Sequence, residues 1–515
     1  MNKIFKYALL GAVVLGLSAC SEDQLNTTPT DSMSGETLLA DATNALVPLN
    51  GIYRSMYTPG WTTTGNTAQT FGISAYNLMA EVMGDDMIMG AMGSGWFWYD
   101  AVYNMKNFYT RSTFRSYDLW KAYYTWIANA NYIIAAQSTM AGDAKAVDYV
   151  MGQAYAIRAY SYFMLEQSFA RNYANHKTEP GVPLYTGPTF TSTTGQPRAT
   201  NQEVYDQINS DINKAVELLQ GTSQQDVSHI GYAVALGLKA RIALTEQDWT
   251  TAADAAVKAI AASGKEILPV KDFAGMNSVK ASNVMWGAQI VTDQAGMYAS
   301  LFAMMDTAVS YGKKAPKQIN LDLYNHMSET DTRRAWWDPN SKYSTGSYEQ
   351  DKFHFSNATT WEGDYVWMRV EEMYLIAAEA YCHAGDDAQA RQYLSALMAK
   401  RDPNFDATQY SGSSLPTLTS DQFTGAYAHS LLNEIILQRR IELWGEAGRI
   451  YDIRRLEQGF RRTSAQGFPT GELLTTRPTD NPESYMWVLT IPQAEFDGNA
   501  NMNASTDQNP VGDLK

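Results

Sequence analysis

Apolar residues repeat with helical spacing over much of the chain. In 366–383 they fall at every third or fourth position, which is the pattern of one buried helix face. Gly385 and Asp386 then supply a helix stop and an N-cap, and a second periodic segment runs to residue 400. The two segments predict a helix pair of about 36 residues, similar to a tetratricopeptide hairpin.

Three further helix pairs are predicted from the same pattern. One uses 118–137 with 146–170, a second lies within 231–262 with a break at 247–249, and the last lies in 430–457. Because such a pair buries its apolar face only by packing on a neighbour, four pairs predict a stacked helical scaffold.

Long segments without helical periodicity separate the predicted pairs. Residues 172–200 hold four prolines and three glycines, 264–345 interleave glycine, asparagine and aromatic residues, and 402–425 are rich in serine, threonine and glycine. Loops of this length inside a folded chain are usually functional. After residue 459 the one strand candidate is 486–491. The predicted fold is mostly α, with tetratricopeptide-like helix pairs packed against an irregular, loop-rich side with minor β-structure.

The first residues have a different character from the rest. Lys3 and Lys6 precede an apolar run over 8–19, which is shorter than the roughly 20 residues of a membrane span and is typical of a secretory signal. The run ends in the sequence LSAC, 17–20, which resembles the bacterial lipobox. By that resemblance Cys20 becomes the first mature residue and carries lipid, whereas the alternative is a plain secreted protein with an incidental cysteine.

The next segment reads as a tether. Its start, Ser21-Glu22-Asp23, resembles the acidic segment that accompanies export to the outer face of the outer membrane in Bacteroidetes-type lipoproteins, although a solvated linker would look similar. Residues 21–35 reach at most about 50 Å. The predicted division is a signal peptide at 1–19, a lipidated tether at 20–35 and a single domain at 36–515. Within that domain the scaffold covers about 36–171, 201–262 and 366–457, the ligand side about 172–200, 264–365 and 402–425, and the tail 459–515.

Charge and cysteine content narrow the function classes. The chain has 39 basic and 54 acidic residues, and after loss of Lys3 and Lys6 with the signal its net charge is −17. Such a field repels nucleic acid and suits a neutral or cationic ligand. With Cys20 lipidated, Cys382 has no partner for an intrachain disulfide.

The sequence holds no common catalytic motif. Patterns such as H-E-x-x-H, C-x-x-C, G-x-S-x-G and the phosphate-binding P-loop are absent. The six histidines are scattered without metal-ligand spacing, so neither a metal nor a cofactor is predicted. Acidic pairs such as Asp85-Asp86 and Glu371-Glu372 are the kind of group that a glycosidase uses. In the sequence MGDDMIMG, however, Asp85-Asp86 is more typical of a turn or loop cap, and we expect no enzymatic activity.

Aromatic residues are abundant, with 13 tryptophans and 32 tyrosines. Four of them follow one another at 96–99, and since neighbouring side chains point in different directions, at least one should be exposed. An exposed ring stacks on the C–H face of a pyranose while nearby polar groups bind the hydroxyls. Trp286 is predicted instead to lie in a buried strand. The candidate ligand-binding residues are Trp96, Trp98, Tyr99, Tyr298, Trp336, Trp337 and Trp61, and the alternative is that they fill the junction between loops and helices.

Four stretches resemble the SusD/RagB family of surface glycan-binding lipoproteins. They are the lipobox with its acidic start, the sequence RVEEMYLIAAEA at 369–380, the sequence QRRIELWGEAGRIYDIRRL at 438–456 and the ending IPQAEFDGNANMNASTDQNP at 491–510. A glycine usual in the third stretch is Ala447 here, and the fourth carries an insertion-like polar stretch. From its residues alone, 438–456 predicts helical ion pairs at i, i+3 that brace the last helix pair: Glu446–Arg449, Arg449–Asp452 and Asp452–Arg455.

The resemblance implies a lipid-anchored protein of the outer membrane that captures oligosaccharide or polysaccharide. It would pass this ligand to a SusC-like TonB-dependent transporter, over which members of the family sit like a lid. The early loops and the middle region would form the glycan platform. Two alternatives stay open, a RagB-like protein that binds peptide or glycoprotein, and a purely architectural subunit.

Overall fold

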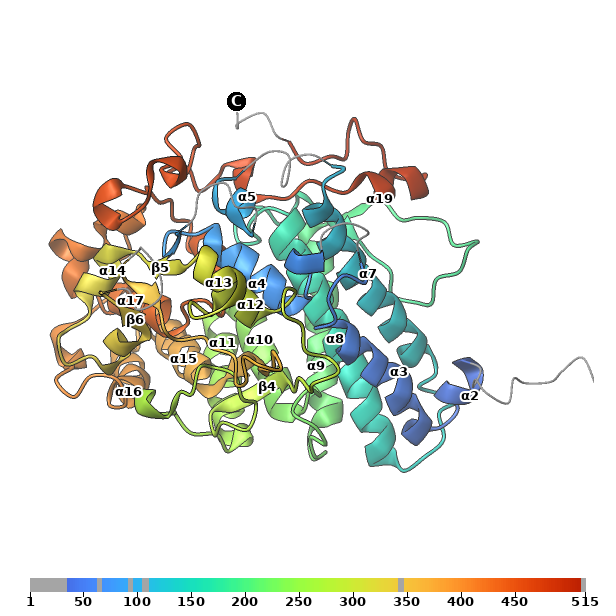
Figure 1. Ribbon diagram of the computed structural model, residues 1–515. Coiled ribbons are helices and arrows are strands. Elements are labelled where there is room, and N and C mark those ends of the chain that lie inside the picture. Colours follow the sequence, from blue (N-terminus) through green and yellow to red (C-terminus); the bar gives the residue numbers. More distant parts are fainter. Residues whose placement is uncertain (1–34, 63–66, 91–95, 104–110, 341–346, 511–515) are drawn as a thin grey trace, which may run out of the picture.

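Helices dominate the computed structural model, which describes residues 35–62, 67–90, 96–103, 111–340 and 347–510 (Figure 1). Cys20 and the predicted signal and tether up to residue 34 lie outside the described residues. The α-helices are α2 (Gly35–Leu39), α3 (Ala42–Ser55), α4 (Ile73–Val82), α5 (Trp98–Ala101), α7 (Phe114–Ala135), α8 (Ala144–Phe169), α9 (Asn201–Leu219), α10 (Tyr232–Glu246), α11 (Trp249–Ser263), α12 (Leu301–Met305), α13 (Ser310–Lys314), α14 (Leu321–His326), α15 (Val370–His383), α16 (Asp387–Met398), α17 (Leu431–Glu442), α18 (Arg449–Arg455) and α19 (Gln493–Gly498).

Neighbouring helices pack along the chain as the sequence predicts. Helix α7 packs on α8, α8 on α9, α10 on α11 and α15 on α16, while α11 and α17 both contact α15 (Figure 1). The prediction of a mostly α fold built from helix pairs is confirmed. No helix in the described ranges is both long and apolar enough to cross a membrane.

Local capping explains where the pairs turn. Asp248 and Asp386 cap α11 and α16 by accepting hydrogen bonds from Thr251 N–H and Gln389 N–H. Gln247, the residue before Asp248, ends α10 with its backbone in the left-handed region (φ 63°). Both predicted breaks, at 247–249 and 385–386, are therefore confirmed.

Three small antiparallel sheets fill the loop-rich side. The strands are β1 (Met87–Met89), β2 (Pro180–Pro183), β3 (Arg198–Thr200), β4 (Val284–Ala288), β5 (Lys317–Ile319), β6 (Trp337–Asp338), β7 (Glu349–Gln350) and β8 (Tyr365–Arg369). They form a sheet of order β1-β5-β7-β6 and two pairs, β2-β3 and β4-β8. Met87 lies opposite Ile319 in the first sheet, which ties the early chain to the middle region.

Two local predictions are wrong. Residues 365–369, expected to begin the helix of 366–383, form β8 because they pair with β4, and the helix starts at Val370. The expected strand at 486–491 does not form: Tyr485–Trp487 is a 3-10 helix, and the residues after it bond to side chains and to Ser168 O instead of to a partner strand. Asn509 donates to Leu489 O at 2.8 Å, and Gln508 accepts from Ile491 N–H at 2.8 Å. Trp286, predicted to lie in a buried strand, is in β4 and fully buried.

Buried charges hold the last helices in place. Of the predicted i, i+3 pairs, Asp452–Arg455 forms at 2.8 Å, but Arg449 pairs with Asp85 at 2.9 Å. The Asp85-Asp86 pair is therefore not a turn cap: it lies in the interior, where Arg440 and Arg449 contact both carboxylates.

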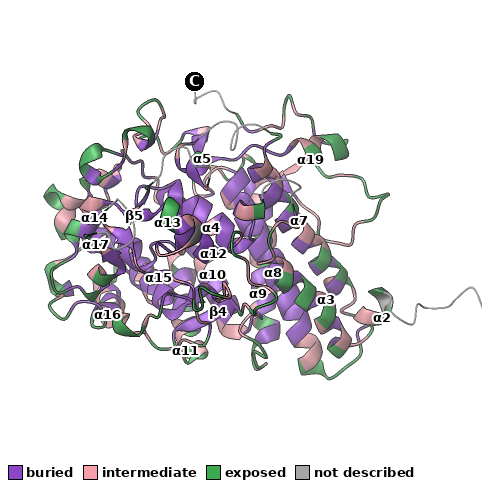
Figure 2. Ribbon diagram, in the orientation of Figure 1, coloured by how far each residue is buried: buried purple, intermediate pink, exposed green. Residues whose placement is uncertain are grey.

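Figure 2 shows the buried residues concentrated in the centre of the molecule, with exposed residues on the outer helix faces.

Candidate functional site

The run of four aromatic residues at 96–99 turns its side chains in different directions. Trp96 is half-buried, Tyr99 is 42 % exposed, and Phe97 and Trp98 are buried. The expectation that at least one ring is exposed is confirmed. Trp96 and Trp98 do not share a face, because Phe97 has φ 70° and α5 begins at the next residue, so the segment is not extended.

Buried polar contacts fix this segment on the body of the protein. Phe97 N–H donates to Gln69 Oε1 at 2.7 Å, which supports the left-handed backbone at that residue. Arg115, fully buried, donates through two nitrogens to the Asp100 carboxylate at 3.0 Å each and lies 4.9 Å from the centre of the Phe97 ring. Paired hydrogen bonds of this kind set orientation as well as distance. These contacts therefore fix the backbone segment that carries Trp96.

Trp96 stacks on a ring from a distant part of the sequence. Its centroid lies 4.3 Å from that of Tyr311 on α13, with 27° between the planes. Tyr311 in turn lies 5.4 Å from Tyr298, whose side chain is 52 % exposed. We call these three residues, Trp96, Tyr298 and Tyr311, the aromatic cluster.

Close packing behind α13 positions Tyr311. A Cβ atom on Gly312 would lie 2.3 Å from Asp306 O, so the two backbone segments approach closely where only glycine fits. The Asp306 carboxylate accepts from Ala308 N–H at 2.9 Å and from Phe355 N–H at 3.0 Å. It also contacts His354 Nδ1 at 3.1 Å. This carboxylate joins the turn before α13 to a separate segment of the chain.

His354 lies between two carboxylates. Its Nδ1 contacts Asp306 and its Nε2 contacts Asp351 at 2.9 Å. Burial lowers the pKa of His354, but the hydrogen bonds and charges of the two aspartates outweigh it and raise the pKa to about 9. His354 is therefore a cation at neutral pH, and it holds the Asp306 carboxylate that lies before α13.

Polar and apolar groups surround the aromatic cluster. Lys313 and Lys314, which follow Tyr311 and Gly312 on α13, are exposed. Met297 is exposed beside Tyr298 in the sequence. Gln294 accepts from Tyr57 OH at 3.5 Å, which links the loop that carries Tyr298 to the segment just after α3. Flat rings next to amine and amide groups can hold a ligand that has both an apolar face and hydroxyls.

Three of the predicted site residues are buried instead of exposed. Trp98, Trp336 and Trp337 are 8 %, 3 % and 2 % exposed, so none presents a ring face to solvent. Trp337 packs edge-on against Trp444 at 5.6 Å between centroids, and Trp336 lies under Lys352 Nζ at 4.6 Å from its centroid. These three tryptophans are therefore not candidates for ligand binding. As the alternative interpretation expected, they fill the interior between loops and helices.

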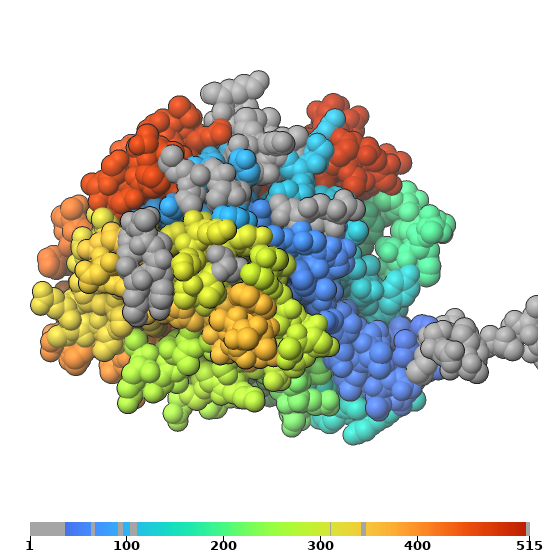
Figure 3. All heavy atoms as spheres, in the orientation of Figure 1, coloured from blue at the N-terminus to red at the C-terminus, as the bar shows by residue number. Residues whose placement is uncertain are grey.

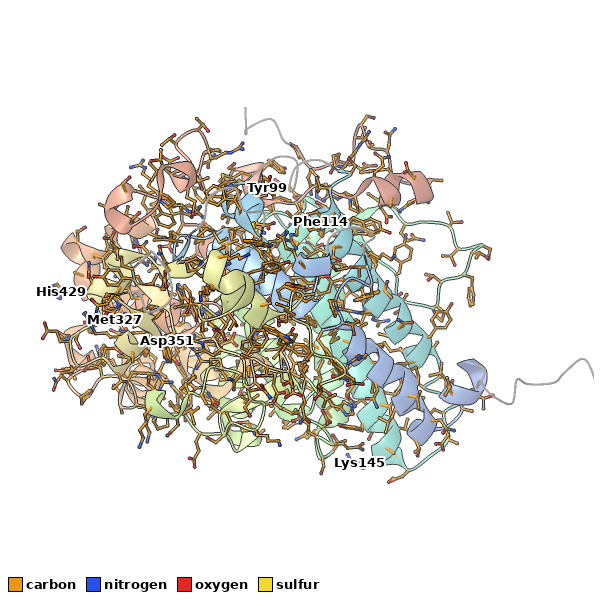
Figure 4. The ribbon with its side chains drawn as sticks, viewed as in Figure 1. Tyr99, Phe114, Lys145, Met327, Asp351 and His429 are labelled. Carbon is orange, nitrogen blue, oxygen red and sulfur yellow. The ribbon has the colours of Figure 1, made fainter. Side chains whose placement is uncertain are left out.

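Two further predicted residues lie outside the aromatic cluster. Tyr99 is at the upper edge of the molecule on α5 (Figure 4). Trp61 is half-buried, and its indole N–H donates to Ser55 O at 2.9 Å, which fixes the ring against α3. The residue that the sequence analysis missed is Tyr311: a single tyrosine in a loop-like segment gives no signal until the fold brings it to Trp96.

Carboxylates and histidines do not assemble a metal centre in the part of the chain that the structure describes. There, no three or more His, Cys, Asp or Glu side chains gather as metal ligands. Burial raises the pKa of Glu81 and of Glu166 to about 8 each, but Glu81 accepts from Gly448 N–H and Glu166 from Val182 N–H in the interior. Their positions are those of structural groups.

Comparisons with known proteins cover almost the whole chain. A family model described as "Starch-binding associating with outer membrane" matches residues 20–244, and one described as "SusD family" matches residues 273–511. The chain has no match among protein sequences with curated descriptions.

Solved structures share the fold over nearly their full length. A SusD-like carbohydrate binding protein from Bacteroides vulgatus is 23 % identical with a TM-score of 0.73, and the match covers 92 % of this chain and 99 % of that one. A SusD superfamily protein from Bacteroides thetaiotaomicron is 21 % identical, with a TM-score of 0.70 and coverage of 91 % and 100 %. Surface glycan-binding protein A from the same species, solved with laminarihexaose, is 17 % identical, with a TM-score of 0.66 and coverage of 91 % and 99 %.

Proposed function

The chain belongs to the SusD/RagB family, and from this premise we propose that it is a nutrient-binding lipoprotein of the cell surface. It captures an oligosaccharide or polysaccharide by stacking sugar rings on the aromatic cluster. It then passes this ligand to a SusC-like TonB-dependent transporter.

The observation that carries the proposal is the stack of rings at the surface. Trp96 and Tyr311 are parallel to within 27°, and Tyr298 continues the row with more than half of its side chain exposed. A side chain that exposes a large ring in the absence of a ligand is available for a second ring-shaped partner. Pyranose rings present such an apolar face, and stacking orders few groups, because an aromatic side chain has only two rotatable bonds.

Known relatives support the same ligand class. Two of the similar solved structures are those of a SusD-like carbohydrate binding protein and of a surface glycan-binding protein in complex with laminarihexaose. A third is that of a laminarin binding SusD-like protein, with a TM-score of 0.65 to this chain. These names favour a glycan over a peptide as the ligand, and binding over hydrolysis as the activity.

The location follows from the proposed lipid anchor. We propose that Cys20 is acylated and that the tether after it holds the folded part at the outer face of the outer membrane. The family description, which includes association with the outer membrane, supports this location. Metabolic labelling with palmitate tests it: label in the wild-type chain that is lost in Cys20→Ala supports the anchor, and equal labelling contradicts it.

Affinity electrophoresis of the chain from residue 21 onward tests the binding proposal. Native gels with and without laminarin, starch, xylan, mannan or pectin are compared for the wild type, Trp96→Ala and Tyr298→Ala. We expect one polysaccharide to retard the wild type and to retard each variant clearly less. Val47→Ala is the matched control, since Val47 is an apolar side chain, 60 % exposed on α3, outside the aromatic cluster.

Two results would redirect the proposal. Retardation that survives both Trp96→Ala and Tyr298→Ala would place the ligand elsewhere on the protein, with Tyr99 and Trp61 as the next candidates. No retardation by any polysaccharide, together with binding of peptides, would favour the RagB-like alternative. Co-purification with a TonB-dependent transporter from membranes tests the proposed partner, and a chain that copurifies with none contradicts it.

A further inference from the structure

A second hollow lies on the side of the molecule where α7 meets α19. It has a volume of about 560 Å³ and is lined by α7, by the segment 185–195 and by residues 492–499 within the tail. In the space-filling view the 184–199 segment (green, right) stands out from the helices below α19 (red) and leaves a hollow beside α7 (Figure 3). None of the residues of the aromatic cluster lines this groove.

Aromatic side chains make the floor of the groove: Tyr124 and Tyr185 are half-buried there, and Trp120, which is 5 % exposed, packs against Tyr124 as a support. Trp120 and Tyr124 are neighbours on α7 with centroids 4.8 Å apart, and Tyr124 lies edge-on to Tyr185 at 6.0 Å. Each ring is fixed through its polar atom: Trp120 Nε1 donates to Glu495 Oε2 at 3.0 Å, and Tyr124 OH donates to Pro183 O at 2.8 Å. The Tyr185 hydroxyl accepts from Gln196 N–H at 3.0 Å and keeps its own proton to donate. The floor is therefore preformed.

The outer wall presents an exposed phenylalanine. Phe190 is 65 % exposed, the largest value among the exposed large apolar side chains of the described residues. It is held outward by a tight turn, in which Phe190 N–H donates to Thr193 Oγ1 at 2.7 Å and Thr193 N–H to Phe190 O at 2.9 Å. Its ring rests edge-on against Tyr132 at 6.0 Å. Because the turn and the Tyr132 contact hold the Phe190 ring in an exposed position, the ring is available for a ligand.

Contacts between the tail and the 184–199 segment close one end of the groove. Asn499 Nδ2 donates to Gln196 O at 2.8 Å, and Asn501 Nδ2 donates to Gly195 O at 2.6 Å. Asn499 Nδ2 also donates to Glu495 Oε1, so both oxygens of that carboxylate have partners within the wall. Among the described residues, the one exposed cation that lines the groove is Lys121, whose Nζ lies 5.6 Å from the centre of the Tyr117 ring.

The remaining polar lining is uncharged. Thr125 and Asn129 on α7 and Thr189 and Thr193 on the outer wall offer hydroxyl and amide groups. A hydrophobic ligand would leave these groups without partners, and an ionic ligand would find one cation and a carboxylate that is already hydrogen-bonded. Aromatic faces ringed by neutral hydroxyls and amides match a neutral sugar, and the volume lies within the roughly 300–1,000 Å³ range of small-ligand sites.

We propose that this groove is a second carbohydrate-binding site, which takes a neutral oligosaccharide of a few pyranose units between Phe190 and the partly exposed floor rings of Tyr124 and Tyr185. The choice of a sugar agrees with the proposed function, but the inference depends on the lining of the groove itself. Two sites on one anchored chain hold a polysaccharide at two points, which raises its residence at the surface without tighter single contacts.

Native mass spectrometry of the chain from residue 21 onward counts the bound ligands. The probes are laminarihexaose, maltohexaose, cellohexaose, xylohexaose and mannohexaose, each titrated against the wild type. Phe190→Ala removes the exposed wall, and Ala128→Trp fills the groove from α7. The matched control is Ala135→Trp, an exposed position on the same helix outside the lining, and Ala494→Trp on α19 replaces Ala128→Trp if that variant does not fold.

We expect two molecules of one hexasaccharide per wild-type chain. Phe190→Ala should weaken one of the two sites fivefold or more, Ala128→Trp should abolish it, and Ala135→Trp should leave both. Tyr298→Ala should remove the other site alone. A single site that only the groove variants remove would support this inference and contradict the proposed role of the aromatic cluster.

Three results would overturn the inference. The first is a single site that only Tyr298→Ala removes, which would leave the proposed function intact. The second is a pair of sites that neither Phe190→Ala nor Ala128→Trp changes. The third is a groove that binds none of the five hexasaccharides, including the case in which a tryptic peptide pool binds there and Ala128→Trp prevents it.

Discussion

The rings of Trp96 and Tyr311 lie stacked at 4.3 Å although 215 positions separate them in the sequence. Trp96 belongs to a segment fixed by the buried Arg115–Asp100 pair, and Tyr311 belongs to a short helix fixed by Asp306. Each ring is thus positioned independently by its own support. The stack is a product of the whole fold, and changes to either support should alter ligand binding.

Gly312→Ala should disturb Tyr311 from behind. The new methyl group would lie 2.3 Å from Asp306 O, which is far closer than two such atoms can approach. Because the clash is with the backbone, α13 must shift to relieve it. We expect the affinity for the glycan to fall about tenfold, which corresponds to about 1.4 kcal/mol. Titration calorimetry measures it.

Gly51→Ala is the matched control for that substitution. A Cβ atom at Gly51 in α3 meets nothing within 4 Å, and alanine in a helix is favoured over glycine by roughly 0.5–1 kcal/mol. Unchanged glycan affinity and equal or higher stability are expected. Equal affinity of Gly312→Ala and wild type would show that the position of Tyr311 does not matter.

His354 should stabilise the fold in a pH-dependent way. Its pKa of about 9 in the folded chain lies above the unfolded value near 6.5, so its contribution is complete below about pH 6.5 and is lost as the pH rises through 9. His354→Gln should therefore lower the free energy of unfolding at pH 6 more than at pH 10. Allowing for partial solvent screening, we expect a difference on the order of 1–2 kcal/mol.

Urea denaturation of both chains at the two pH values measures this effect. Asp306 and Asp351 flank the ring and are the two carboxylates whose contacts the substitution changes. An equal loss at pH 6 and pH 10 would show that the histidine acts through packing alone.

The acidic pair at Asp85 and Asp86 should matter for folding. Asp86→Asn weakens the charge that holds Arg440 and Arg449 in the interior, and breaking a buried pair typically costs on the order of 3 kcal/mol. Chemical denaturation should show this loss. Asp254→Asn is the control, since its pair with Lys258 is exposed, and its unfolding midpoint should match the wild type.

Trp337 should act as a core residue. Trp337→Phe should lower the free energy of unfolding by on the order of 1–2 kcal/mol, because a ring packed against Trp444 becomes smaller. The loss is limited, since the indole N–H has no hydrogen-bond partner among the described residues and its removal relieves a buried polar group. Glycan affinity should stay the same, and a specific loss of binding without loss of stability would contradict this assignment.

Periodicity and capping were sufficient to predict the scaffold. The helix pairs and their turns at Asp248 and Asp386 follow from local sequence, because each is encoded within a few dozen residues. The strand β8 was missed because pairing with β4 depends on residues some 80 positions away.

The site was harder to predict for the same reason. Tryptophan alone does not distinguish an exposed ring from a buried one: Trp96 is half-buried and stacks on Tyr311, whereas Trp337 is 2 % exposed and packs against Trp444. Tyr311 and the groove residue Phe190 carried no local signal. Their roles come from contacts with Trp96 and Tyr132 that exist only in the folded chain.

The most direct test is the dissociation constant of the retarding glycan for the wild type and for Tyr298→Ala, measured by calorimetry on folded samples with equal unfolding midpoints. Because Tyr298 is more than half exposed, its truncation should leave stability unchanged. We expect the dissociation constant to rise at least tenfold. An unchanged constant would contradict the claim that the aromatic cluster holds the ligand.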